Sequence, residues 1–402
     1  MQGYEAVVVG LGATGSAAVY QLAQAGVRVL GIDRLAPPHT YGSSHGDTRI
    51  TRLAIGEGDV YVPFVRRSHE LWREIEVDSG AGLLHQVGGV VISPVAGGAA
   101  MHGSDDFFSA TVDIARRHGV DHEVLDAGQL ADRFPQFGVG AEHAGYFEPD
   151  AGFVMAEAAV RAQLDLAVRH GAQLRRDERV LDVLPSGDGV VVRTDRGRYG
   201  AGTAVLAAGP WLPELIDPDL GGLFTVYRQV VNWFAGDLAD GSFEPDRCPV
   251  FIWQFGPGEE DVCYGFPAID GPGGGVKVGT EHYGSPVTPD TVRREVLPSE
   301  VEQTYHRCVA GRLPALRAAA VRSVSCLYTV TPDFGFVVDR HPLHHGVIVA
   351  SPCSGHGFKH SAAVGESIAQ LVTTGTSTLD LSPFALGRLT SPAGGSGSGG
   401  RR

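Results

Sequence analysis

Two arginines and two lysines in separate parts of the chain can hold anions. Arg49 and Arg52 stand three residues apart in the segment SSHGDTRITRLA, close to His45. Lys277 lies between valines in GGGVKVGTEHYG, and Lys359 follows a glycine turn in SGHGFK. A planar guanidinium can form two parallel hydrogen bonds to a carboxylate, and a fixed ammonium stabilises a developing negative charge. The two arginines are therefore candidates for a local anion site in a chain whose formal net charge is −14.

The N-terminal segment has the pattern of a β–α–β unit. An apolar run at residues 6–9 predicts a strand, residues 16–25 a helix, and residues 27–32 a second strand. The segment GLGATG connects the first strand to the helix and matches G-x-G-x-x-G. An acidic residue ends the second strand, about 20 residues further on, as in dinucleotide-binding units. The complete pattern therefore predicts a dinucleotide site.

Each glycine of this motif has a separate physical role. Gly10 permits the tight turn, Gly12 lets a pyrophosphate approach the backbone, and Gly15 lets the helix and the strand pack closely. The amides at the helix N-terminus attract phosphates, so the motif residues Ala13 and Thr14 are expected to contact the cofactor. The acidic residue is Asp33, which would accept hydrogen bonds from ribose hydroxyls.

Length and composition limit the class of protein. The 402 residues suffice for two domains or one large intertwined unit, and a content of 43% hydrophobic and 19% charged residues is typical of globular proteins. The acidic balance argues against nucleic acid or an anionic membrane surface as the main partner. No secretory signal or run of about 20 apolar residues is apparent, so the sequence favours a cytoplasmic protein.

The cysteines favour reduced thiols over a disulfide framework. They are odd in number and dispersed, without a C-x-x-C pair. Cys353 and His356 are two potential metal ligands, but no second pair stands nearby, so no metal site is expected. The five cysteines are Cys248, Cys263, Cys308, Cys326 and Cys353.

The remaining segments alternate between helical, strand-like and turn-rich patterns. Residues 105–120 and 156–172 are expected to be helical, and residues 203–211 form a buried strand that runs into a glycine turn. A strand, a glycine turn and a helix are expected again over residues 346–375. Tyr61, Phe64 and Trp72 are expected in the core of a helix that follows the arginine segment. Four segments read as antiparallel strands of a sheet that covers the substrate: residues 227–236, 249–256, 262–270 and 273–284.

Three segments carry a family resemblance. HTYGSSHGDTRITR, SCLYTVTPD and SGHGFK follow the nucleotide motif in this order, and together they resemble the monomeric sarcosine oxidase and N-methyltryptophan oxidase family. The resemblance runs from Tyr4 to about Leu389. It implies an FAD enzyme that oxidises the C–N bond of an N-methyl or other secondary amino acid. The products would be an imine and, from O2, hydrogen peroxide, and the enzyme would be a monomer.

The same resemblance implies an α/β fold, α+β overall. A Rossmann-type FAD-binding domain of the glutathione-reductase-like type would join a substrate domain with a large antiparallel or mixed β-sheet. We expect the FAD-binding domain to be discontinuous, with residues 1–86, 146–222 and 324–388. The substrate domain would contain residues 87–145 and 223–323, and the Gly/Ser-rich residues 389–402 would form a flexible tail.

The resemblance also implies a covalent flavin, attached through an 8α-S-cysteinyl thioether. The matching position is Cys326, although a single cysteine among apolar residues is more often a small core residue. Cys353 precedes the second glycine turn and is the nearest competitor. The further residues expected to contact the cofactor are Arg34, Ser44, Thr48, Arg49, Val180, Gly209, Trp211, Gly355, Gly357, Phe358 and Lys359.

Two readings of the arginines remain open. By resemblance, Arg49 and His45 lie near the flavin ring, and Arg52 reaches the substrate carboxylate. In a helical segment, positions 49 and 52 would lie on one face. The alternative is a pair of solvated surface arginines that pair with Asp47 and Glu57.

The lysines and their neighbours complete the implied site. Lys359 matches the second carboxylate partner, and Lys277 matches a lysine that assists reaction with O2, although a strand lysine is usually edge-exposed. The family carries a histidine four residues after this lysine, where this chain has Glu281, followed by His282. Either a local strand shift brings His282 into that place, or Glu281 faces the substrate and favours a cationic or hydroxylated one. Tyr328 would bound the pocket with its ring.

Other functions remain as alternatives. A flavin dehydrogenase would pass electrons to another acceptor, and an oxidase of a cyclic imino acid would serve a biosynthetic pathway. A non-catalytic flavoprotein would not need Arg52, Lys277 and Lys359 around one ring, and a nicotinamide dehydrogenase explains only the N-terminal unit. For the amine oxidase, activity is expected to rise with pH as the bound amine loses its proton.

Overall fold

The computed structural model describes residues 3–95 and 99–390. Most of the tail that we predicted for residues 389–402 therefore lies outside the described residues. Within the described part of the chain, no helix combines the length and the apolar character that crossing a membrane requires.

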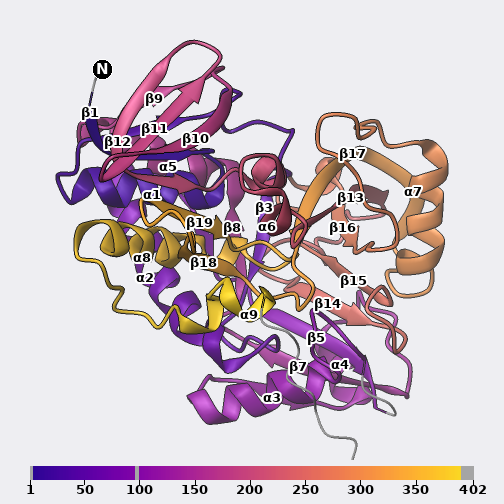
Figure 1. Cartoon of the computed structure of the whole chain (residues 1–402). Helices are drawn as coiled ribbons and strands as arrows, with labels where there is room; N and C mark the ends of the chain where they lie inside the picture. The colour runs from indigo at the N-terminus through magenta and orange to yellow at the C-terminus, as the bar shows by residue number, and fades with distance from the viewer. Residues whose placement is uncertain (1–2, 96–98, 391–402) are drawn as a thin grey trace, which may run out of the picture.

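One eight-stranded sheet contains the nucleotide-binding unit, at the upper left of Figure 1. Its central strands are parallel: β1 (Gly3–Val9) lies between β2 (Val29–Ile32) and β12 (Arg198–Leu206), and β12 also pairs with β19 (Val347–Ser351). Three separate stretches of the chain thus supply neighbouring strands, as expected for a discontinuous domain. The outer strands are β9 (Gln173–Arg175), β10 (Val180–Ser186), β11 (Gly189–Thr194) and β18 (Val337–Arg340).

Helices cover this sheet. α1 packs against both α5 and α8, and α2 packs against α8 and α5. Tyr61, Phe64 and Trp72 are buried in the core around these helices, as the sequence predicted. The helix expected at residues 16–25 starts three residues earlier, directly after the glycine motif. The four bounds are Ala13–Gln24 for α1, Val62–Ser79 for α2, Ala156–Arg169 for α5 and Ser361–Thr373 for α8.

A second eight-stranded sheet occupies the right and lower parts of Figure 1. The four predicted antiparallel segments form neighbouring strands, in the order β13, β16, β15 and β14, and β14 pairs with β5 in parallel. The bounds are β5 (Gly89–Pro94), β6 (Glu123–Leu125), β7 (His143–Glu148), β13 (Thr225–Gly236), β14 (Val250–Gln254), β15 (Val262–Gly265), β16 (Val276–Thr280) and β17 (Leu316–Val330). Longer helices beside this sheet are α3 (Phe107–His118), α4 (Ala127–Arg133) and α7 (Pro298–Thr304).

Two of the predicted domain boundaries fall inside strands. The boundary at 145/146 divides β7, and the boundary at 323/324 divides β17, although both strands belong to the second sheet over their whole length. The division into two domains stays a proposal, and it requires both boundaries to move beyond these strands. The remaining short elements are η1 (Asp59–Tyr61), η2 (Gly209–Glu214), α6 (Pro218–Gly221), η3 (Pro272–Gly274), η4 (Tyr305–Val309), η5 (Phe358–His360), η6 (Ser382–Phe384) and α9 (Gly387–Thr390).

The arginine segment lies in a small third sheet, so the expectation that it is helical is wrong. β3 (Thr48–Thr51) pairs with β8 (Gly152–Met155), which also pairs with β4 (Leu84–His85). Three of the four residues of β3 are β-branched, and such residues fit an extended strand better than a helix.

Candidate active site

The glycine motif packs as tightly as its sequence predicted. Gly10 has φ +88°, and a Cβ there would lie 2.5 Å from the carbonyl oxygen of Ala207 on the neighbouring strand. A Cβ on Gly15 would lie 1.7 Å from the carbonyl oxygen of Gly10. Any side chain at Gly15 would therefore push α1 away from β1. Asp33 ends β2, and its Oδ2 accepts a hydrogen bond from the amide of Leu11 at 2.7 Å.

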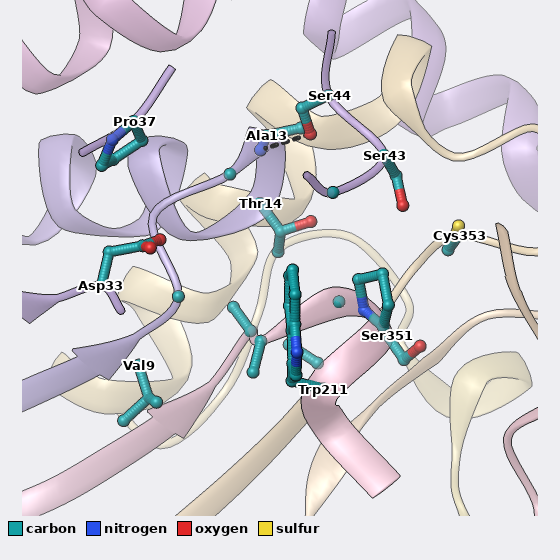
Figure 2. Close-up of a pocket in the computed structure, with 18 of the residues that line it drawn as sticks. Val9, Ala13, Thr14, Asp33, Pro37, Ser43, Ser44, Trp211, Ser351 and Cys353 are labelled. Atoms are coloured by element: carbon teal, nitrogen blue, oxygen red, sulfur yellow. Dashed lines mark hydrogen bonds between the residues drawn. The ribbon is translucent and has the colours of Figure 1, made fainter. Parts of the chain in front are cut away.

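A long cleft runs from this motif to the second sheet. Asp33 lies at one side of it and Cys353 at the other, with Trp211 between them (Figure 2). Ser44 accepts a hydrogen bond from the amide of Ala13 at 3.1 Å and so joins the arginine segment to α1. The predicted cofactor contacts that line this cleft are Gly10, Gly12, Ala13, Thr14, Asp33, Arg34, Ser44, Arg49, Val180, Gly209, Trp211, Gly355, Gly357 and Phe358.

The polar groups of the cleft fit a dinucleotide. The N-cap of α1 is Gly12, which offers no side chain to the amides of the first turn. Apart from the Ala13 amide, which donates to Ser44, the amides of this first turn are therefore available to a phosphate. The buried hydroxyl of Ser351, on the cleft wall, has no hydrogen-bond partner among the described residues. Since buried polar groups are nearly always hydrogen-bonded, this hydroxyl is a candidate contact for a bound cofactor.

Four predicted cofactor residues do not line the cleft. Gly15 acts in packing, Thr48 and Cys326 are buried and line neither space, and Lys359 lines a second cavity. Cys326 is buried on β17, opposite Gln229 of β13, whereas Cys353 reaches the cleft and accepts a hydrogen bond from the amide of Thr329. Burial raises the pKa of both thiols, and nearby Arg49 opposes that rise. All five cysteines are free.

A second cavity adjoins the far end of the cleft. Four residues line both spaces: Arg49, Tyr328, Gly355 and Phe358. The two tyrosine hydroxyls of the cavity, on Tyr264 and Tyr328, lie 3.4 Å apart, and burial raises the pKa of both, so they remain protonated. A small molecule in this cavity would lie beside the end of whatever fills the cleft.

Arg52 and Lys359 face this cavity and share an anion. Arg52 is 4% exposed, and its guanidinium donates to Glu57 at 2.7 Å and to the carbonyl of Ala54 at 2.6 Å. Lys359 is 5% exposed and donates to the carbonyl of His356 at 2.8 Å, with its Nζ 3.7 Å from Glu57. The alternative prediction that Arg52 is a solvated surface residue is therefore wrong, although its predicted ion pair with Glu57 is present.

Buried charges in this group influence one another. Burial alone would raise the pKa of Glu57, but Arg52 and then Lys359 hold it well below its usual range. Burial lowers the pKa of Lys359 to about 8, against the opposing effect of Glu57. Lys359 is thus a cation that loses its proton just above neutral pH.

Arg49 lines both spaces, whereas His45 and Lys277 line neither. Both lie near Arg49, whose charge adds to burial in lowering the pKa of each. Arg49 donates to the carbonyls of Ser43, His45 and Thr48, so it fixes the arginine segment, and it does not pair with Asp47. Asp47 pairs instead with Arg322. Burial, followed by the charge of Arg49, lowers the pKa of His45 to about 3, so this imidazole is neutral.

Lys277 lines neither space. Its Nζ lies 2.7 Å from the carbonyl oxygens of Gly46 and Thr48 and 3.0 Å from the Thr48 hydroxyl, over the ring of Phe266. Three acceptors match the three hydrogens of an ammonium, although burial lowers the pKa of this lysine well below its usual value. The edge-exposed alternative is wrong, because Lys277 is 2% exposed.

Glu281, and not His282, lines the second cavity. Side chains alternate along an extended chain, so Lys277, Gly279 and Glu281 point to one side and His282 to the other. His282 bonds Thr280 at 3.0 Å, and its side chain is 41% exposed. The local shift that would bring His282 into the site is therefore wrong.

Sequence reasoning did not find several residues of this cavity. Met101 and His102 come from a stretch whose sequence shows no helix or strand pattern. Tyr264 and Phe266 lie in a segment that was predicted as a strand, but neither was predicted to line the site. The sequence suggested Glu57 only as the partner of an arginine at the protein surface. No signal in one sequence marks His102, because contacts with residues 45 and 179 positions away define its place.

A separate group of three potential metal ligands lies away from both spaces. Within the described residues, Asp217, His341 and His344 have ligand atoms within 4.8 Å of one another. The imidazole of His341 accepts from the amide of Leu343 at one nitrogen and lies 2.9 Å from Asp217 at the other. Its two nitrogens are thus engaged in an internal hydrogen-bond network, which accounts for this cluster without a metal.

Comparisons with known proteins agree with this geometry. The family model described as "FAD dependent oxidoreductase" matches residues 5–371. Monomeric sarcosine oxidase from Streptomyces avermitilis is 38% identical over 392 residues, covering 96% of this chain and 98% of that protein. N-methyl-L-tryptophan oxidase from Salmonella dublin is 32% identical over 391 residues, covering 96% and 99%. The structure of NikD, an unusual amino acid oxidase essential for nikkomycin biosynthesis, aligns with a TM-score of 0.80 at 26% identity, covering 96% and 98%.

Proposed function

The chain belongs to the family of FAD-dependent oxidoreductases that includes the monomeric sarcosine and N-methyltryptophan oxidases, and we propose that it is an FAD-dependent oxidase of a secondary or N-methyl amino acid. The observation that carries this proposal is the position of two buried cations. Arg52 and Lys359 face one cavity, and that cavity adjoins the end of the cofactor cleft.

Different residues of the cleft would bind different parts of FAD. The amides at the start of α1 would hold the pyrophosphate, and Asp33 would hold the ribose next to the adenine. The far end of the cleft, with Arg49, Tyr328 and Phe358, would hold the flavin ring. When bound, the flavin supplies the two-electron chemistry that amino-acid side chains lack.

The substrate carboxylate would bind between Arg52 and Lys359. Glu57 contacts both cations, so a substrate carboxylate would compete with it for the hydrogen bond that Arg52 donates. The buried cavity excludes water and strengthens these contacts. Tyr264, Tyr328 and Phe266 would bound the amine and its methyl or ring carbons.

The nitrogen must be unprotonated when its neighbouring C–H bond is broken. A neutral amine needs no side-chain base, and both tyrosine hydroxyls remain protonated because burial raises the pKa of each. Activity would therefore rise as the bound amine deprotonates.

Three finer points belong to the same proposal. Cys326 is proposed as the attachment point of the flavin, Lys277 as the cation that assists the reaction with O2, and the monomer as the working form in the cytoplasm. A covalent bond at Cys326 requires its thiol to reach the flavin from behind the present cleft wall, since it does not line the cleft. Lys277 would act next to Arg49 at the junction of cleft and cavity.

A panel of N-methyl, N-alkyl and cyclic amino acids, scored by peroxide release in air, tests the function. We expect peroxide with at least one carboxylate-bearing amine and none with the corresponding amines that lack a carboxylate. Flavin bleaching under nitrogen without peroxide formation in air would indicate a dehydrogenase. Purified protein that contains no FAD, and takes up none, would refute the proposal.

A further inference from the structure

His102 lies between two carboxylates at the wall of the second cavity. Its Nδ1 is 3.2 Å from Glu57, and its Nε2 is 2.9 Å from Glu281. All three side chains are at most 3% exposed. An ionised carboxylate can only accept hydrogen bonds, so both ring nitrogens must carry a hydrogen. A carboxylate at each ring nitrogen therefore favours the imidazolium form of this ring.

Other groups around His102 agree with a positive ring. Its backbone amide donates to Glu259 at 2.7 Å, and the hydroxyl of Tyr283 donates to Glu281 at 2.7 Å. The ring of His356 stacks on it at 5.1 Å, and burial lowers the pKa of His356 well below its usual value, so that ring is neutral. Burial alone would lower the pKa of His102, but Glu281 and then Glu57 raise it to about 9.

The imidazolium changes what Glu281 can do. A carboxylate at the cavity wall without a partner would stabilise the ammonium form of a bound amino acid, and that form cannot be oxidised. Here both oxygens of Glu281 are engaged, by His102 and by Tyr283. His102 and Tyr283 thus compensate the charge of Glu281, so Glu281 does not require a cationic side chain on the substrate.

The charges of the cavity can be counted. Arg49, Arg52, Lys359 and His102 are the cations of its lining, and Glu57 and Glu281 are its carboxylates. The positive excess is two with His102 charged and one without it. A greater positive excess lowers the pKa of a bound amine, because it disfavours the ammonium.

We propose that His102 is a positioning residue that neutralises Glu281 and so selects the amino acid as its anion, with a carboxylate and a neutral amine. This proposal rests on the proposed function, since it concerns the same site. It narrows the substrate to amino acids without a second cationic group near the amine. It also explains how Glu281 can line a cavity in which the substrate amine must be uncharged to react: the charge of His102 compensates the carboxylate.

Two ligands of one shape test this role. Glycine betaine and 3,3-dimethylbutanoate both carry a carboxylate and a trimethyl head, but only betaine has a positive charge at the head. Their dissociation constants can be measured on the holoenzyme from the change in flavin absorption. We expect the wild type to prefer the uncharged head, and His102→Gln to lower that preference about tenfold or more, because a unit charge acts at short range in a buried site.

Three further variants separate charge from structure. His102→Lys keeps the positive charge and should retain the preference, and Tyr283→Phe removes a hydrogen bond to Glu281 without a charge change and should leave it within about twofold. The double variant His102→Gln/Glu281→Gln removes both charges and should return to the wild-type preference. If His102→Gln does not fold, the double variant can still be measured, because it contains no unpaired charge at position 281.

A second readout is the rate of flavin reduction by substrate under nitrogen. The pH at half-maximal rate should move up by about one unit in His102→Gln and return in the double variant. An unchanged ligand preference in His102→Gln, or a double variant that prefers betaine, would overturn the role of His102. Failure of both ligands to perturb the wild-type flavin would instead overturn the carboxylate site, and with it the proposed function.

Discussion

Replacing Glu57 by glutamine removes the anion that Arg52 and Lys359 share. Glutamine has the same shape, so its neutral amide oxygen can still accept the hydrogen bond that Arg52 donates to Glu57 at 2.7 Å. In the wild type, a substrate carboxylate must compete with Glu57 for the same guanidinium. We therefore expect the variant to bind carboxylates more tightly.

The magnitude follows from the lost competitor. A hydrogen bond to a charged group contributes about 1.5–3 kcal/mol, and a tenfold change in affinity corresponds to about 1.4 kcal/mol. The dissociation constant of 3,3-dimethylbutanoate should therefore fall by about tenfold to a hundredfold in Glu57→Gln. Without ligand, the variant should be less stable by about 2 kcal/mol, because a neutral hydrogen bond replaces the charged one between Arg52 and Glu57.

The two effects can be measured on one protein sample. Flavin absorption gives the dissociation constant, and thermal unfolding with and without ligand gives the change in stability. For 402 residues, ~2 kcal/mol corresponds to a fall of about 2–3 °C in the melting temperature. Saturating ligand should remove most of this difference.

A second buried glutamate provides the matched control. Glu148 accepts hydrogen bonds from the amides of Leu53 and Ala54 and from the hydroxyl of Tyr146, and it lines neither the cleft nor the second cavity. Glu148→Gln should lose stability without any gain in carboxylate affinity. If Glu57→Gln binds the ligand no more tightly than the wild type, Glu57 does not occupy the substrate position and the proposed binding mode is wrong.

Three other predictions concern the cofactor and the lysines. After acid precipitation, the yellow colour should stay in the pellet for the wild type and for Cys353→Ser but pass into solution for Cys326→Ser; retention in Cys326→Ser would exclude that residue as the attachment point. Lys277→Met should slow the reaction of the reduced enzyme with O2 by about a hundredfold or more, as for loss of a fixed charge beside a developing anion. Flavin reduction by substrate under nitrogen should change far less in this variant, and equal losses in both half-reactions would argue for a structural role. The pKa of Lys359 is lowered to about 8, so its charge is present below pH 8 and is lost as the pH rises through that value. Carboxylate affinity should accordingly fall above pH 8 in the wild type and stay level in Lys359→Arg, whose side chain keeps its charge; a wild-type profile that is flat from pH 7 to 10 would contradict this.

The parts of the molecule that the sequence predicts best depend on short-range patterns. The nucleotide unit is one of them, because turn, strand and helix follow one another within about thirty residues and each glycine has a steric reason. The four strands around Lys277 are another, since their apolar runs and turn glycines have regular spacing. Arg49 and Arg52 were assigned the wrong local structure, because a spacing of three is compatible with a helix and β3 is only four residues long.

The identity of the charges that meet in the cavity depends on the tertiary fold. Glu57 comes from the turn after β3, and His102 comes from the stretch before α3. Glu281 directly follows β16, and Lys359 lies in η5, between β19 and α8. Four distant segments thus bring two carboxylates and two cations into one buried group. Lys359 and Glu281 were expected near the substrate only through the family resemblance, and Glu57 was expected only as a partner of a surface arginine. Pattern alone does not predict their burial, because charged side chains are rarely buried unless they are paired.

The alternation of one strand links the two half-reactions that we propose. Lys277 and Glu281 lie four residues apart along β16 and its extension, so both side chains point to the same face of the sheet. One lies at the junction with the cofactor cleft, and the other lies at the wall of the second cavity. A one-residue slip of this strand would turn both side chains away together and would bury His282 in place of Glu281. The register of β16 against β13, with Lys277 opposite Trp233, would therefore fix the proposed oxygen site and the proposed amine site together.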